Sequence, residues 1–132
     1  MVAGGDGRCD SPGHSAKYGT YSIVNMASSK VLDFSLVQVT EVKNSNAMEL
    51  EGLKCCLDHL QQEQVAIAKL ATDRHVQDRA HMKKKRPHIK HNFNVWHLAK
   101  SVQKKLTKAL KPWIHSIITH LWWCAKIGRA HV

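Results

Sequence analysis

Two aspartates follow short runs of small or apolar residues, where a strand is expected to give way to a loop or a helix. Asp6 lies in Gly5-Asp6-Gly7 near the start of the chain, and Asp73 follows the apolar run 65–72. Carboxylates presented from strand ends can share divalent metal ions. Such ions stabilise the attacking and leaving oxygens when nucleic acid strands are cut and joined. Asp6 and Asp73, here called the aspartate pair, are therefore candidate metal ligands with catalytic potential.

The elements expected to position this pair form an alternating series. Residues 1–6 predict the stub of a strand, and residues 7–17 a loop. Residues 18–26 and 31–39 predict an antiparallel hairpin. A helix is expected to run to about residue 62, with Asn46 and Glu49 as its capping box. Residues 65–72 predict a buried parallel strand. A helix over 75–85, a strand over 88–96, a helix from about 97 and a last helix opened by Pro112 follow.

This order, β-β-β-α-β-α-β-α, predicts a mixed α/β sheet flanked by helices. It is the order of the RNase H-like fold, in which the first and fourth strands are neighbours. Asp6 and Asp73 would then face each other across one site. Asp10, in the loop beyond the first strand, is the alternative for the first acid.

Composition limits the class of protein. The chain has 132 residues, enough for one domain with a modest core. It has no run of about eighteen apolar residues, so no membrane span is expected. Its start does not have the pattern of a secretory signal. The four cysteines form no C-x-x-C pair, which indicates reduced intracellular thiols and not a disulfide framework.

The net charge of +10 predicts a polyanionic partner, with nucleic acid the first choice and an acidic membrane surface the second. The basic residues gather in two clusters, which are candidates for phosphate contacts in DNA binding: Lys83, Lys84, Lys85 and Arg86, and Lys104, Lys105, Lys108 and Lys111. The first cluster also resembles a nuclear import signal. The alternative is a solvated helix end whose positive charge complements the helix dipole.

Three segments, 5–18, 72–75 and 95–100, resemble animal proteins derived from DDE-type cut-and-paste transposases of a Kolobok-like kind. The resemblance covers about residues 4–125. It implies an RNase H-like core, strand cleavage and transfer by two magnesium (or manganese) ions held by three acids, a DNA partner, a nuclear location and a homo-oligomeric parent. Asp6 matches the first acid and Asp73 the second. His97 would support the site.

The chain departs from this family in two places. The third acid should be a glutamate well downstream of Asp73, but the last glutamate of the chain is Glu63. Asn94 stands three residues before His97, where related cores often carry Asp or Cys, so a charge is lost there. Two of three acids do not suffice for catalysis, and we expect the chain to be inactive.

The two ends indicate a fragment. Residues 126–132 are similar to the translation of a common sequencing adapter, and the apolar pattern of the last helix stops near Ala125. We therefore expect a partial RNase H-like core over 1–125 and a foreign tail over 126–132. The alternatives are a non-enzymatic DNA- or chromatin-binding protein of transposon origin, and a truncated polypeptide that does not fold stably.

Two further groups have structural interpretations. Five histidines do not match a compact zinc-site spacing: His75, His81, His88, His91 and His97. The four tryptophans are expected to be core residues, with base stacking as the alternative: Trp96, Trp113, Trp122 and Trp123. Because Trp122 and Trp123 are adjacent, one of them should face away from that core.

Overall fold

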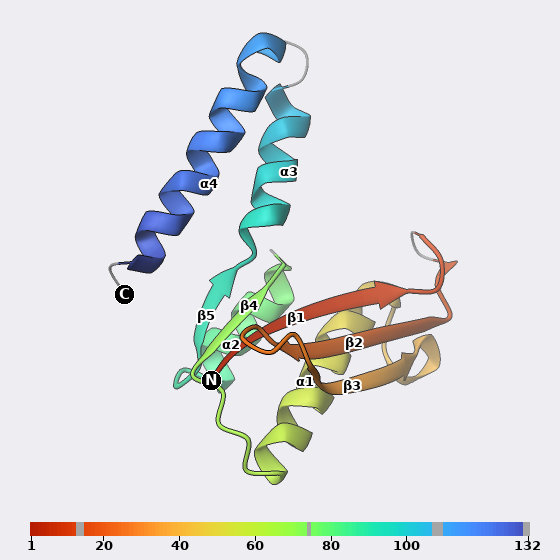
Figure 1. Ribbon diagram of the computed structural model, residues 1–132. Coiled ribbons are helices and arrows are strands. Elements are labelled where there is room, and N and C mark those ends of the chain that lie inside the picture. Colours follow the sequence, from red (N-terminus) through yellow and green to blue (C-terminus); the bar gives the residue numbers. More distant parts are fainter. Residues whose placement is uncertain (13–14, 74, 107–109, 131–132) are drawn as a thin grey trace. The chain divides into compact units, whose positions relative to one another are not determined.

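A computed structural model describes residues 1–12, 15–73, 75–106 and 110–130 of the chain (Figure 1). For residues 96, 97 and 127–130 it describes the backbone alone. The chain divides into two compact units, Met1–Asn92 and Phe93–Val132. Within the described residues, no helix combines the length and apolarity that crossing a membrane requires.

The strands form one five-stranded sheet in the order β3-β2-β1-β4-β5. Their bounds are β1 Val2–Cys9, β2 Tyr18–Asn25, β3 Val31–Gln38, β4 Lys69–Thr72 and β5 Lys90–Phe93. β1 pairs antiparallel with β2, and β2 antiparallel with β3, so the expected hairpin is confirmed. β1 pairs in parallel with β4, which agrees with the expected adjacency of the first and fourth strands. The predicted mixed α/β class is confirmed.

β1 is a full strand of eight residues, and the predicted stub followed by a loop from Gly7 is wrong. Its pairing with β2 runs from Ala3 opposite Asn25 to Cys9 opposite Gly19. Asp6 therefore lies inside the strand and not at its end. Glycine-rich sequence has low strand propensity, but backbone pairing with β2 and tight packing on one face of β1 override it here.

Helices α1 (Ser45–Gln62) and α2 (Val76–Lys85) lie against one face of the sheet (Figure 1). The buried core fills the space between these helices and the strands. Its members are Ala3, Tyr21, Ile23, Leu53, Cys56, Leu57, Leu60, Ile67, Leu70, Met82 and Ile89. The opposite face carries the exposed side chains of Phe34 and Leu36 on β3. The core thus fixes α1 and α2, the two helices that bear the candidate site, on the covered face.

The cap of α1 differs from the predicted one. The side chain of Asn44, not of Asn46, accepts a hydrogen bond from the backbone N–H of Ala47 at 3.1 Å. Asn44 has the extended backbone of an N-cap, and the helix begins at Ser45. Glu49 is therefore not the capping-box partner that the sequence suggested. Its carboxylate is available for other contacts.

Asn44→Ala is expected to lower the free energy of unfolding by about 1 kcal/mol, because the first turn of α1 loses the acceptor for one of its unpaired N–H groups. Asn46→Ala is the matched control, since Asn46 is exposed and lies within the helix. It should change stability by less than about 0.5 kcal/mol. Urea unfolding followed by circular dichroism measures both. A larger loss for Asn46→Ala would restore the predicted cap.

The second unit is a helical hairpin. Helices α3 (Val95–Leu106) and α4 (Ile114–Ala130) lie side by side (Figure 1), and Pro112 sits in the short 3-10 turn Lys111–Trp113 before α4. α4 continues beyond Ala125, where the apolar sequence pattern ends. Trp113, Trp122 and Trp123 are exposed. The prediction of a core position is therefore wrong for Trp113 and for one of the adjacent pair, whereas exposure of the other member of that pair is as expected. Two helices bury one seam only, and a side chain off that seam stays in solvent. Trp96 lies outside the described side chains.

Candidate metal centre

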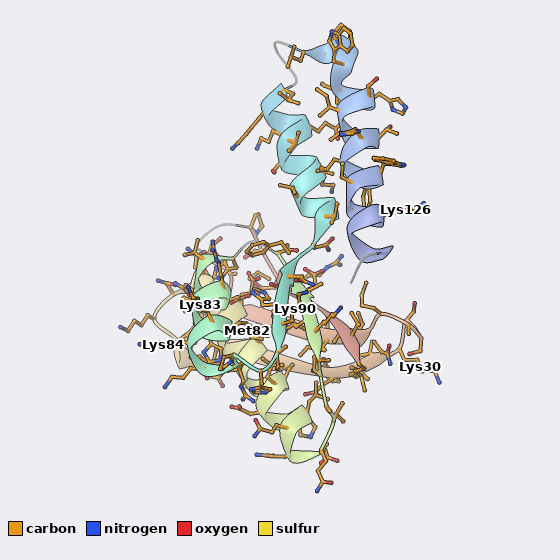
Figure 2. All side chains as sticks on the ribbon, turned by 90° about the vertical axis from the view of Figure 1, so that its left-hand side faces the viewer. Lys30, Met82, Lys83, Lys84, Lys90 and Lys126 are labelled. Atoms are coloured by element: carbon orange, nitrogen blue, oxygen red, sulfur yellow. The ribbon has the colours of Figure 1, made fainter. Side chains whose placement is uncertain are left out.

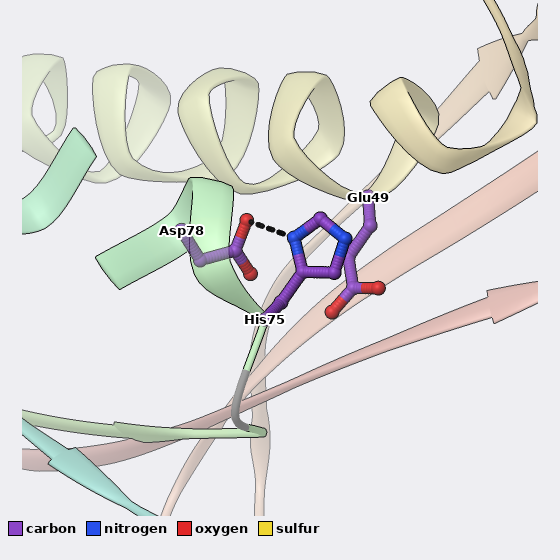
Figure 3. Close-up of side chains that lie close together, drawn as sticks. All are labelled: Glu49, His75 and Asp78. Carbon is purple, nitrogen blue, oxygen red and sulfur yellow. Dashed lines mark hydrogen bonds and ion pairs between the residues drawn. The ribbon is translucent and has the colours of Figure 1, made fainter. Parts of the chain in front are cut away.

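Three side chains from α1 and the start of α2 converge at one point, and we call them the Glu49 cluster: Glu49, His75 and Asp78. One ligand atom of each lies within 4.8 Å of the others. Figure 3 shows the His75 ring between the two carboxylates. Glu49 is on the first turns of α1, His75 immediately precedes α2, and Asp78 is in the first turn of α2. Carboxylates and imidazoles are the oxygen and nitrogen ligands of metal sites in proteins.

β1 leaves room for this cluster because of its glycines. A Cβ atom at Gly7 would lie 2.8 Å from Cγ of Glu49, and one at Gly5 would lie 2.4 Å from the hydroxyl oxygen of Tyr21. Both distances are below any normal contact, so a side chain at either position would displace its neighbour. The glycines on either side of Asp6 thus permit Glu49 and Tyr21 to lie against the covered face of β1.

Asp78 is the buried member of the cluster. Its side chain is 0% exposed, whereas that of His75 is 26% exposed. Nδ1 of His75 and Oδ1 of Asp78 lie 3.3 Å apart, as a hydrogen bond or ion pair. Among the described residues, the other oxygen of Asp78, Oδ2, has no hydrogen-bond partner, and neither has the Tyr21 hydroxyl. A buried polar atom without a partner is costly, so each such atom calls for an explanation.

The two carboxylates of the cluster carry perturbed pKa values. Burial raises the pKa of Glu49, the negative charge of Asp78 raises it further, and His75 opposes both effects. Burial likewise raises the pKa of Asp78, again against the influence of His75. Ionised carboxylates that are both buried and close to one another are disfavoured unless a positive charge joins them. The centre is therefore electrostatically suited to a cation.

Asp6 lies within β1, and Asp73 directly follows β4, the strand that pairs with β1. The parallel register of β1 and β4 sets Ala3 opposite Leu70 and Gly4 opposite Ala71. Continued for two residues, this register aligns Asp6 with Asp73. The side chain of Asp6 is 55% exposed and is 4.0 Å from Arg8. Side chains alternate along a strand, so Asp6 points away from the face on which Gly7 meets Glu49. The charges of Asp6 and Asp73 nevertheless act on the pKa of Glu49.

Asp10, the alternative first acid, stabilises a turn. Its Oδ1 accepts a hydrogen bond from the backbone N–H of Lys17 at 3.1 Å, and its own N–H donates to the carbonyl of Tyr18 at 3.0 Å. These contacts close the connection between β1 and β2. The sequence predicts that His97 supports the site and that Lys108 contacts phosphate. Neither side chain belongs to the described part of the structure.

The predicted DNA-binding residues differ in how far their side chains are exposed and able to contact a phosphate. Lys83, Lys84 and Lys85 are exposed in the last turn of α2, and Lys83 and Lys84 project outward in Figure 2. Arg86 instead makes an ion pair with Asp58 and a hydrogen bond with Gln61. Its side chain is 13% exposed, so it offers little surface to a phosphate. In the second unit, Lys104 and Lys105 are exposed in the last turn of α3.

Sequence reasoning did not assign the Glu49 cluster to any site. In the sequence, Glu49 fits a capping box with Asn46, and Asp78 carries no local signal beyond its place in the first turn of a helix. The i,i+3 spacing of His75 and Asp78 was visible in the sequence, but the partner from α1 was not. Comparisons with protein-family models, with curated proteins and with solved structures found no match. The described residues thus define an α/β protein with a candidate metal centre.

Proposed function

We propose that this chain is a DNA-binding fragment related to DDE transposases, with a partial RNase H-like core and no strand-cleaving activity of its own. The observation that carries the proposal is the parallel pairing of β1 with β4, which sets Gly4 opposite Ala71; continued for two residues, this register would set Asp6 opposite Asp73. The sheet order β3-β2-β1-β4-β5 with its antiparallel first three strands also supports an RNase H-like topology.

The aspartate pair is chemically suited to magnesium, since Mg²⁺ prefers oxygen ligands and is commonly held by one or two carboxylates. Magnesium, when bound there, would polarise a phosphodiester oxygen and activate water. Asp6 and Asp73 would hold the ion, and the exposure of Asp6 leaves room for a substrate phosphate. Glu49 precedes Asp73 in the chain and meets β1 on the opposite face, so it does not supply the missing third acid.

DNA binding rests on the exposed lysines of α2. Lys83, Lys84 and Lys85 form a compact group of positive charges that can release counterions from a phosphate backbone. The ion pair of Arg86 with Asp58 anchors the end of α2 to α1 and so holds these lysines in place. The same exposed lysines favour the second candidate function, a non-enzymatic DNA- or chromatin-binding protein of transposon origin. In that case binding would not depend on Asp73.

The affinity of the full chain for a short DNA duplex is expected to fall steeply with salt. Replacing Lys83, Lys84 and Lys85 together by Gln should reduce the slope of log affinity against log salt by about 2 to 3, since each lost phosphate contact removes about 0.9. Fluorescence anisotropy measures both slopes. The matched control replaces Lys17, Lys30 and Lys43, three exposed lysines elsewhere in the chain, and carries the same change in net charge.

An equal loss of slope in the two triple variants would show that net charge, and not α2, binds DNA. An affinity independent of salt would contradict the proposal. Strand cleavage is tested separately, with magnesium or manganese and a labelled duplex. Robust cleavage that Asp6→Asn and Asp73→Asn both abolish would show that the chain is an active enzyme. Unchanged DNA affinity in Asp73→Asn would favour the non-enzymatic alternative.

A further inference from the structure

We propose that Glu49, His75 and Asp78 form a binding site for a divalent transition-metal ion of the zinc type. The site is distinct from the aspartate pair and does not depend on DNA binding. It is built where the first turns of α1 meet the start of α2, on the covered face of the sheet.

The spacing of the ligand atoms suits such an ion. Nδ1 of His75 and Oδ1 of Asp78 lie 3.3 Å apart. In a tetrahedral site with metal–ligand bonds of about 2.0 Å, two ligand atoms are separated by about 3.3 Å. One ligand atom of Glu49 lies within 4.8 Å of those of His75 and Asp78, so rotation about the side-chain bonds of Glu49 would have to shorten this distance for all three residues to hold one ion. A metal ion would replace the proton that now joins His75 to Asp78.

The burial of Asp78 is a second and independent observation. A fully buried carboxylate is costly unless it is paired, yet Oδ2 has no hydrogen-bond partner among the described residues. His75 alone leaves this oxygen unsatisfied. A cation bound beside the Asp78 carboxylate would neutralise its charge and give Oδ2 a partner. A purely structural ion pair, by contrast, gives no reason for an unsatisfied buried oxygen at this position.

The ligand types select the metal. One imidazole with two carboxylates suits zinc and related transition metals, whereas magnesium prefers oxygen ligands alone. Affinity for such a site also rises along the first-row series from manganese towards copper and remains high for zinc. Three protein ligands leave a coordination position for water. The partial exposure of His75 gives the ion a path from solvent.

The test is a zinc titration of the full chain after treatment with EDTA, with a chromophoric chelator as competitor and magnesium in large excess. Zinc is expected to bind despite the magnesium and to raise the melting temperature. His75→Gln and Glu49→Gln should each weaken zinc binding about tenfold or more. His81→Gln is the matched control, because His81 is a partly buried histidine of α2 outside the cluster. Asp6→Asn is the control for the aspartate pair.

Circular dichroism checks that each variant keeps its fold, and two independent ligand variants ensure that misfolding of one does not decide the result. Loss of zinc in both folded variants, with retention in His81→Gln and Asp6→Asn, supports the site. Undiminished zinc binding by His75→Gln and Glu49→Gln would overturn it, since the ion would then be held by other histidines or cysteines. Displacement of zinc by magnesium would overturn the choice of metal.

Discussion

Gly52→Val is expected to destabilise the fold by about 2 to 3 kcal/mol, a large share of the stability of a small domain. Gly52 faces Tyr21 of β2 across the contact between α1 and the sheet. A Cβ atom there would lie 2.6 Å from Cβ of Tyr21 and 3.7 Å from its Cα. Neither the backbone of β2 at Tyr21 nor the buried Tyr21 ring has room to shift, so α1 would have to move away from the sheet. Urea unfolding of the two proteins measures the difference.

Cys55→Val is the matched control for this change. Cys55 is exposed on the same helix, so it receives the same β-branched side chain without meeting the sheet. It should change the free energy of unfolding by less than about 0.5 kcal/mol. Equal losses in the two variants would mean that packing against Tyr21 does not limit position 52. Because α1 also carries Glu49, Gly52→Val should weaken any metal bound at the cluster.

Asp78→Asn should flatten the dependence of stability on pH in the metal-free protein. Burial raises the pKa of Asp78 above its ordinary value, so the folded state binds this proton more tightly than the unfolded state. Its contribution to stability is therefore fully present below the ordinary pKa and is lost as pH rises through the raised one. Burial raises the pKa of Glu49 in the same direction in the variant too, but the contribution of the Asp78 charge is removed there.

The measurement is the difference in unfolding free energy between wild type and Asp78→Asn in EDTA, from acidic to mildly alkaline pH. This difference should move in favour of the variant as pH rises. In excess zinc the trend should reverse, because metal binding needs deprotonated carboxylates and wild type alone keeps the full ligand set. A difference that moves in favour of wild type as pH rises in EDTA would contradict a raised pKa at Asp78.

Local patterns explain why much of the architecture was predictable. The alternation of side chains in β2, with Tyr21 and Ile23 buried, predicts a strand on its own, and the short connection to β3 predicts the hairpin. The apolar run before Asp73 predicts the buried strand. The predictions failed where a local signal was weak or ambiguous: glycine-rich β1, the choice between Asn44 and Asn46 as a cap, and the tryptophans of α4.

The sequence by itself determined the mixed α/β class, the order of the strands and helices along the chain, and the basic surface on α2, because each depends on residue types or on periodicity within one segment. Tertiary structure alone decided which carboxylates gather. Glu49 and Asp78 are far apart in the chain and meet only because α1 and α2 pack on the same face of the sheet. Burial then perturbs their pKa values, and burial is a property of packing that no local pattern contains.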